Sequence, residues 1–210
     1  MIINNEKIKQ SVETQSPIEL IVDGLPRSVD EYNLVLTKFL EACNQQKIED
    51  NLVYCLGELL SNADKANLKR LYFKEKGLDI NNSDDYKLGM KTFLEETFSN
   101  FSYYAKLKDK ENLYVKLYLL KEIDKIIIET RNNSILTEFE YERIFKRIDN
   151  AKQFNSLAEA VMNVDSSEGA GLGIVSIILI LKKIGLDKSA FNVYCNNGET
   201  ITGITLPLFY

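Results

Sequence analysis

The sequence of 210 residues contains no histidine. This absence excludes Ser-His-Asp and Cys-His catalysis, the zinc motifs that rely on histidine, and any phosphohistidine within the chain. Whatever chemistry the protein performs must therefore use carboxylates, amides, lysines, arginines or the backbone.

Cysteine and long apolar runs are also scarce. Cys43, Cys55 and Cys195 are odd in number and lie in apolar surroundings, so reduced core thiols are expected rather than a disulfide or a metal site. The longest apolar run, residues 174–181, is far shorter than the roughly 20 residues that span a bilayer. The N-terminus lacks the apolar core of a signal peptide. These features predict a cytoplasmic protein that does not engage a membrane.

Length and composition set further bounds. Hydrophobic residues make up 45% of the chain and charged residues 27%, as is usual for a soluble globular protein. The net charge of −5 argues against general nucleic-acid binding, which needs a basic face. We expect a loosely ordered arm over residues 1–16 and a single domain over 17–210, without internal repeats.

Helical and alternating patterns follow one another along the chain. Ser28, followed three residues later by Glu31, forms a capping-box pattern that starts a helix. Turn signals bound an inserted helical hairpin over residues 74–110, whose aromatic side chains we expect to pack onto the domain: Phe98, Phe101, Tyr103 and Tyr104.

The remaining segments predict the fold class. Strands are expected over 18–22, 113–119, 125–130, 190–195 and 200–206, and further helices over about 50–73, 137–162 and after residue 173. We therefore predict an α/β (α+β) fold: a two-layer sandwich with a mixed, mainly antiparallel sheet that helices cover on one face.

One predicted helix carries two distinct stripes. Its apolar stripe follows a 3.6-residue period and consists of Leu52, Leu56, Leu59, Ala63 and Ala66. Glu58, Asn62 and Lys65 form a second stripe at i, i+4 and i+7. A carboxylate, an amide oxygen and an ammonium suit a magnesium-bound polyphosphate, since they can orient a nucleophile, hold the metal and neutralise phosphate. A solvated amphipathic helix is the alternative.

A glycine-rich loop lies about a hundred residues further on. Gly169, Gly171 and Gly173 alternate just before an apolar helix, so backbone N–H groups could approach a phosphate at the positive end of the helix dipole. The loop is neither a Rossmann fingerprint nor a P-loop, because no βαβ unit follows and no Lys-Ser/Thr pair follows the glycines. A tight structural turn is the alternative.

Together these segments resemble the histidine-kinase-type ATPase family, known as the GHKL or Bergerat fold. The segment from Glu58 to Lys65 (ELLSNADK) is similar to the family's N-box, and residues 169–174 (GAGLGI) are similar to its second glycine box. The resemblance covers about residues 18–208, apart from the insertion at 74–110.

The resemblance implies roles for individual residues. Asn62 would hold Mg²⁺, Glu58 would be the general base and Lys65 would reach phosphate. Residues 135–168 would form the lid over ATP. The loop that cradles the phosphates would consist of Gly169, Ala170, Gly171, Leu172 and Gly173.

The counterpart of the family's first glycine box departs from the pattern. Asn132 stands where an adenine-reading aspartate belongs, and Ser134 and Leu136 replace glycines. An asparagine carbonyl can still accept a hydrogen bond from the adenine amino group, although without charge. Leu136 could tighten the purine pocket or block it, so weakened affinity, altered base preference and loss of binding all stay open.

The resemblance implies a cytoplasmic ATP-binding signalling protein with ATP and Mg²⁺ as cofactors. It would act as an ATPase or as a kinase in trans on a partner protein, because the chain holds no histidine to phosphorylate. A homodimer is compatible with this interpretation. The alternative is a degenerate, non-catalytic Bergerat domain that binds a signalling partner through the insertion and the lid.

Overall fold

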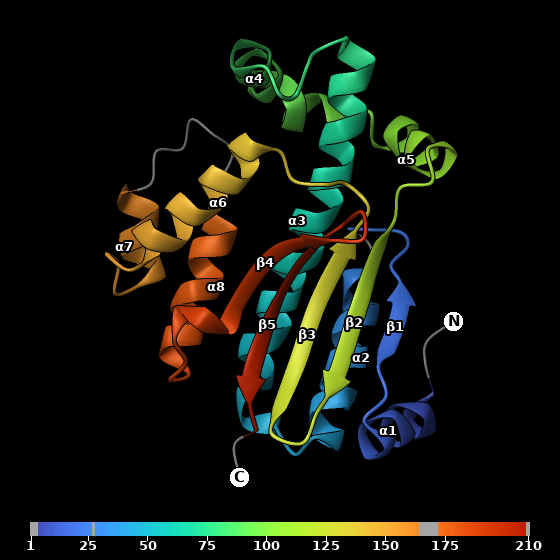
Figure 1. Ribbon diagram of the computed structural model, residues 1–210, viewed down its shortest axis with the longest axis vertical. Coiled ribbons are helices and arrows are strands. Elements are labelled where there is room, and N and C mark those ends of the chain that lie inside the picture. The colour runs from blue at the N-terminus through green and yellow to red at the C-terminus, as the bar shows by residue number, and fades with distance from the viewer. Residues whose placement is uncertain (1–3, 27, 164–171, 209–210) are drawn as a thin grey trace.

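The computed structural model describes residues 4–26, 28–163 and 172–208 (Figure 1). Its helices are α1 (Asn5–Thr14), α2 (Val29–Ala42), α3 (Glu49–Lys76), α4 (Ser83–Ser99), α5 (Phe101–Lys110), α6 (Glu138–Ala151), α7 (Leu157–Asn163) and α8 (Leu172–Lys183), with 3-10 turns at Gln46–Ile48 and Lys188–Ala190. Its strands are β1 (Ile18–Ile21), β2 (Val115–Lys121), β3 (Lys125–Asn132), β4 (Phe191–Asn196) and β5 (Glu199–Pro207).

The five strands form one sheet in the order β1-β2-β3-β5-β4. Each pairing is antiparallel, so the mainly antiparallel character predicted from the sequence is confirmed, while the described strands contain no parallel pair. The β4–β5 hairpin turns through Asn197 and Gly198, which both have positive φ, as a tight two-residue turn requires.

Helices α2, α3 and α8 lie on the same side of the sheet (Figure 1). Their apolar stripes join the inward side chains of the strands in one core, because alternate strand residues point to that face. Leu36 of α2, Leu56 of α3 and Ile177 of α8 are fully buried there beside Leu117 and Ile128 of the sheet. The predicted two-layer α/β sandwich is therefore confirmed.

Helix α3 continues well past the end of the sheet and organises a second apolar cluster with α4 and α5 (Figure 1). Gly89 permits close packing there, because a Cβ at this position would lie 2.6 Å from Cζ of Phe73. The predicted helical hairpin over 74–110 is confirmed as α4 and α5. Of its aromatics, Tyr104 is buried and Phe101 is half-buried, whereas Phe98 and Tyr103 are exposed, so the expectation that all four pack onto the domain is met only in part.

Three local expectations also need correction. Residues 5–14 form helix α1, which buries Ile8 and Val12, instead of a loose arm. Ser28 makes no side-chain cap to α2; its hydroxyl instead donates to the carbonyl oxygen of Asp23. The segment 137–162 divides into α6 and α7 rather than forming one helix.

The cysteines are free thiols, as predicted, but one of the three is not in the core. Cys43, Cys55 and Cys195 are all unpaired by disulfides. Burial raises the pKa of both Cys43 and Cys55 to about 12, as expected for inert core thiols. Cys195 is exposed instead, near the end of β4, where the last three residues of the strand are all exposed. Among the described helices, none has the length and apolar character needed to cross a membrane.

Candidate nucleotide-binding site

The apolar stripe of α3 determines where its polar stripe points. Leu52, Leu56, Leu59 and Ala63 are buried against the sheet and its neighbours, as the 3.6-residue spacing predicts, while Ala66 is half-buried. Consequently Asn62 and Lys65 line a cavity between α3 and the inner face of the sheet. Glu58, one turn earlier, lines an adjoining groove that shares Lys65 with the cavity.

The cavity encloses about 170 Å³. An engineered cavity of about 150 Å³ takes up benzene, so this volume admits one aromatic ring system. The sheet contributes Asn132, Val193, Thr200 and Thr202, and Leu136 follows β3. Leu136 is therefore part of the lining of the cavity.

Gly173, at the start of α8, touches the polar stripe of α3. A Cβ on Gly173 would lie 2.3 Å from Oε2 of Glu58 and 3.5 Å from Nδ2 of Asn62. The fold therefore brings the N-box-like and glycine-rich segments together, and only glycine leaves room for the Glu58 carboxylate as it stands. Leu172 is half-buried at the first position of α8, whereas Gly169, Ala170 and Gly171 lie outside the described residues.

A buried network of amides and hydroxyls fixes Asn132, which is 2% exposed. The amide nitrogen of Asn67 donates to the Tyr114 carbonyl, so the Asn67 Oδ1 atom must act as an acceptor. That oxygen accepts from the Ser134 hydroxyl at 2.7 Å and from Nδ2 of Asn132 at 3.3 Å. The second bond of Asn132 also uses Nδ2, which donates to the Ser134 carbonyl. The Asn132 Oδ1 atom is thus the acceptor that this side chain can offer to a ligand.

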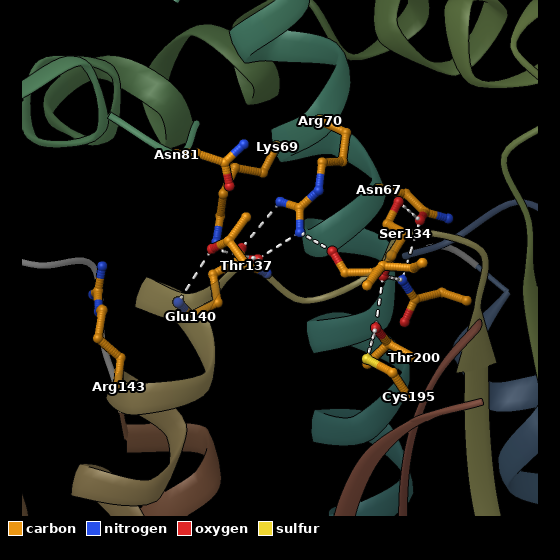
Figure 2. Close-up of polar contacts among 12 residues, drawn as sticks. Asn67, Lys69, Arg70, Asn81, Ser134, Thr137, Glu140, Arg143, Cys195 and Thr200 are labelled. Carbon is orange, nitrogen blue, oxygen red and sulfur yellow. Dashed lines mark hydrogen bonds and ion pairs between the residues drawn. The ribbon is translucent and has the colours of Figure 1, made fainter. Parts of the chain in front are cut away.

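Sequence reasoning missed Asn67, Ser134 and Thr200 as members of this network. Thr200 pairs with Asn132 across β3 and β5, and its hydroxyl donates to the Ser134 carbonyl at 2.6 Å (Figure 2). The strand register was the signal that could have identified Thr200. Asn67 lies on a helix 65 residues before Asn132 and 67 before Ser134, so no local pattern marked it.

Basic side chains dominate the charged lining of the cavity. Lys65 and Lys69 come from α3, and Arg143 and Arg147 from α6, whereas Glu140 is the one acidic residue of the described lining. A mainly cationic lining favours an anionic ligand.

Glu140 binds the start of the predicted lid to α3. Its carboxylate pairs with Lys69 at 2.7 Å and with Arg70, and it completes a capping box with Thr137 (Figure 2). Burial acts to raise the pKa of Glu140, but the charge of Lys69 and the hydrogen bond from Arg70 outweigh it and hold this pKa well below the ordinary value. The carboxylate is therefore ionised and serves as an anchor.

Helix α4 also contributes to the cavity wall. Tyr86, Met90, Phe93 and Leu94 of this helix belong to the lining. The Tyr86 hydroxyl accepts a hydrogen bond from Arg143 at 2.7 Å, which links α4 to α6. The segment predicted as an insertion is therefore part of the cavity wall.

The predicted Mg²⁺ can be compared with the ligands that the described residues offer. The described residues include no group of three or more acidic, histidine or cysteine side chains that could cage a cation. Mg²⁺ is commonly held by one or two protein oxygens together with substrate phosphates and water. The half-buried Asn62 fits that limited role, which depends on a phosphate ligand.

Comparison with known proteins adds one relative. An uncharacterized protein of Treponema pallidum (strain Nichols) is 40% identical over 209 residues, which cover 99% of this chain and 41% of that protein. The chain thus spans about two fifths of the relative's length. No family model and no solved structure matches the chain.

Proposed function

We propose that this chain binds Mg-ATP in the manner of the histidine-kinase-type ATPase class. The base would lie in the cavity near Asn132, and the phosphates would extend toward Gly173. The contact of Gly173 with Glu58 and Asn62 is the observation that carries the proposal. It joins two segments, over a hundred residues apart, to which the resemblance assigns phosphate and metal binding.

The charges around the cavity support the same ligand. Lys65 and the two arginines of α6 belong to a cationic lining suited to a polyphosphate. Asn132 would accept a hydrogen bond from the amino group of adenine. When bound, Mg²⁺ would neutralise phosphate charge, with Asn62 as its protein ligand.

Glu58 is the residue proposed for chemistry. Its carboxylate would accept a proton from a water molecule, giving ATP hydrolysis, or from a hydroxyl group of a partner protein, giving phosphoryl transfer in trans. Either activity suits a cytoplasmic signalling protein.

A non-catalytic interaction module is the second candidate. It is favoured by Asn132, which offers no charge to adenine, and by the exposed aromatics Phe98 and Tyr103. A protein of this kind would use α4 and α5 to bind its partner without turnover.

Isothermal titration with Mg-ATP tests the proposal. We expect binding heat for the wild type and its loss in Asn62→Ala. Asn51→Ala is the matched control, because Asn51 is also half-buried on α3 but does not line the cavity. If the wild type gives no heat, nucleotide binding is refuted.

Glu58→Ala then tests catalysis in a protein that binds ATP. We expect hydrolysis or transfer to disappear while the Kd for Mg-ATP stays within a few-fold, because the carboxylate acts on the nucleophile rather than on the nucleotide. Unchanged turnover would remove Glu58 as the base.

A further inference from the structure

Another pocket, of about 540 Å³, lies at the end of the sheet that points away from α4, where β2 turns into β3 and β5 ends (Figure 1). The connection from α2 to α3 forms one side, through residues 43–45, 47 and 48. Lys121 of β2, Ile184 after α8 and Leu208 after β5 complete the lining. We call it the basal pocket. Its volume falls within the roughly 300–1,000 Å³ that small-molecule sites occupy.

The basal pocket is separate from the cavity proposed to bind the nucleotide. The described linings of the two have no residue in common. Ile48, at the basal pocket, and Asn62, at the cavity, are roughly 20 Å apart along α3, because each helical residue adds about 1.5 Å. An occupant of the basal pocket is therefore a different ligand.

Lys121 has an unusual position for a lysine. Strand residues alternate between the two faces of a sheet, so Lys121 lies on the same face of β2 as the buried Leu117 and Leu119, which point to the helical layer. Its positive charge acts on the Cys43 thiol at the end of α2, where it opposes the rise in pKa that burial causes. The Lys121 ammonium is therefore close to Cys43, on the side of the sheet that the helices cover.

No carboxylate neutralises the charge of the basal pocket. Its described lining contains two lysines, Lys47 and Lys121, and no acidic residue. Among the described residues, neither lysine takes part in an ion pair; Glu122, beside Lys121, pairs with Lys125 at 3.1 Å instead. Two ammonium groups without a counter-charge favour an anionic occupant.

Apolar side chains supply the other part of the recognition surface. Ile48, Ile184 and Leu208 are half-buried and pack against the main core. An occupant that covers them removes further apolar surface from water. Inorganic phosphate would leave these side chains uncovered, and a neutral apolar molecule would leave the two lysines unpaired.

We infer that the basal pocket binds an organic carboxylate with an apolar body. The carboxylate pairs with Lys47 and Lys121 through charge-assisted hydrogen bonds, and the apolar body covers Ile48, Ile184 and Leu208. The inference is independent of the proposed nucleotide binding, since it uses neither Asn62 nor Gly173.

Isothermal titration without nucleotide tests the inference with four probes. Decanoate carries both the charge and an apolar body, whereas decanol lacks the charge and acetate lacks the apolar body. We expect decanoate to bind about tenfold more tightly than either, because each of them loses one kind of contact. The fourth probe, 1-naphthoate, distinguishes the two sources of such a ligand: tighter binding than decanoate assigns an aromatic carboxylate, and weaker binding an aliphatic one.

Lys121→Met should weaken decanoate binding about tenfold, because methionine keeps an apolar stem but removes the ammonium. Lys125→Met is the matched control, since Lys125 is also half-buried at the same end of the β2–β3 hairpin but does not line the pocket. Its Kd for decanoate should equal that of the wild type. Circular dichroism checks that both variants are folded.

Three results would overturn the basal pocket as a carboxylate site. They are the absence of binding heat with both decanoate and 1-naphthoate, equal affinity for decanoate and decanol, and equal affinity of Lys121→Met and Lys125→Met. Each can occur whether or not Mg-ATP binds, so this inference and the proposed function fail separately.

Discussion

At the scale of the residue, Gly173 matters most because it lies within a helix and also packs closely against the Glu58 carboxylate. It lies in α8, where alanine would be the better helix former by about 1 kcal/mol. The glycine is nevertheless needed for the contact with Glu58, since any Cβ would occupy the space of the carboxylate oxygen. Packing of one side chain thus overrides helix propensity at this position.

Gly173→Ala is therefore expected to displace the Glu58 carboxylate, which is the flexible end of a side chain, rather than the backbone. Because misplacing a reacting group by about 1 Å can cost roughly 100-fold, the proposed turnover of ATP should fall by that order. Steady-state hydrolysis measures the loss, and thermal unfolding should show that the fold is kept.

Gly57→Ala controls for helix propensity. Gly57 lies within α3, and its added Cβ would meet no atom within 4 Å. Its hydrolysis rate should stay near that of the wild type. Equal turnover in Gly173→Ala would contradict a role for the Gly173–Glu58 contact.

Individual residues also show which parts of the candidate site could be predicted from the sequence and which could not. The sequence could predict the direction of three polar side chains of α3, those of Glu58, Asn62 and Lys65. The 3.6-residue period of a helix fixes their direction once the apolar stripe is known. The buried network around Asn132 could not be predicted, because the hydrogen bonds of Asn67 and Thr200 depend on how a helix and two strands meet. Local periodicity carries no information about such contacts.

At the scale of the element, helix α6 is attached to α3 through one carboxylate. Glu140 satisfies the first turn of α6 and simultaneously pairs with Lys69 and Arg70. Arg70 also donates to the Ile135 carbonyl at 2.6 Å, so the segment leading into α6 is held as well. The beginning of the predicted lid is thereby connected to the helix that carries Asn62 and Lys65.

Glu140→Gln should lower the free energy of unfolding by about 1.5–3 kcal/mol at pH 7, the range for a hydrogen bond to a charged group. The pKa of Glu140 is lower in the folded state than its ordinary value of 4.5, so the unfolded state takes up the proton first in acid. The stabilisation is therefore complete above about pH 5.5 and is lost as the pH falls below 4.5.

Urea unfolding of wild type and variant across this pH range measures the effect. The difference between them should shrink from pH 7 toward acid. Glu138→Gln is the control, since Glu138 is exposed in the same turn of α6. A difference that stays constant with pH would mean that Glu140 acts through its shape rather than its charge.

At the scale of the whole molecule, α3 joins two apolar clusters. Ala63 and Ile174 belong to the core beneath the sheet, whereas Tyr86 and Phe93 belong to the cluster built with α4 and α5. All four line the cavity proposed to bind the nucleotide. The sequence predicted the helical hairpin, but its role as a wall of this cavity depended on the length of α3, which extends beyond the sheet.

Because both clusters line one cavity, a bound nucleotide should stabilise them together. At a ligand concentration of 100 times Kd, the gain is about 2.7 kcal/mol, which for a chain of this size corresponds to a rise in Tm of about 5–10 °C. Tyrosine fluorescence includes the signals of Tyr72, Tyr86 and Tyr104 in the cluster of α4 and α5, and far-ultraviolet dichroism reports on the whole fold. With Mg-ATP both signals should move to the same higher Tm, whereas a shift in only one of them would show that the clusters unfold independently and that the ligand contacts just one.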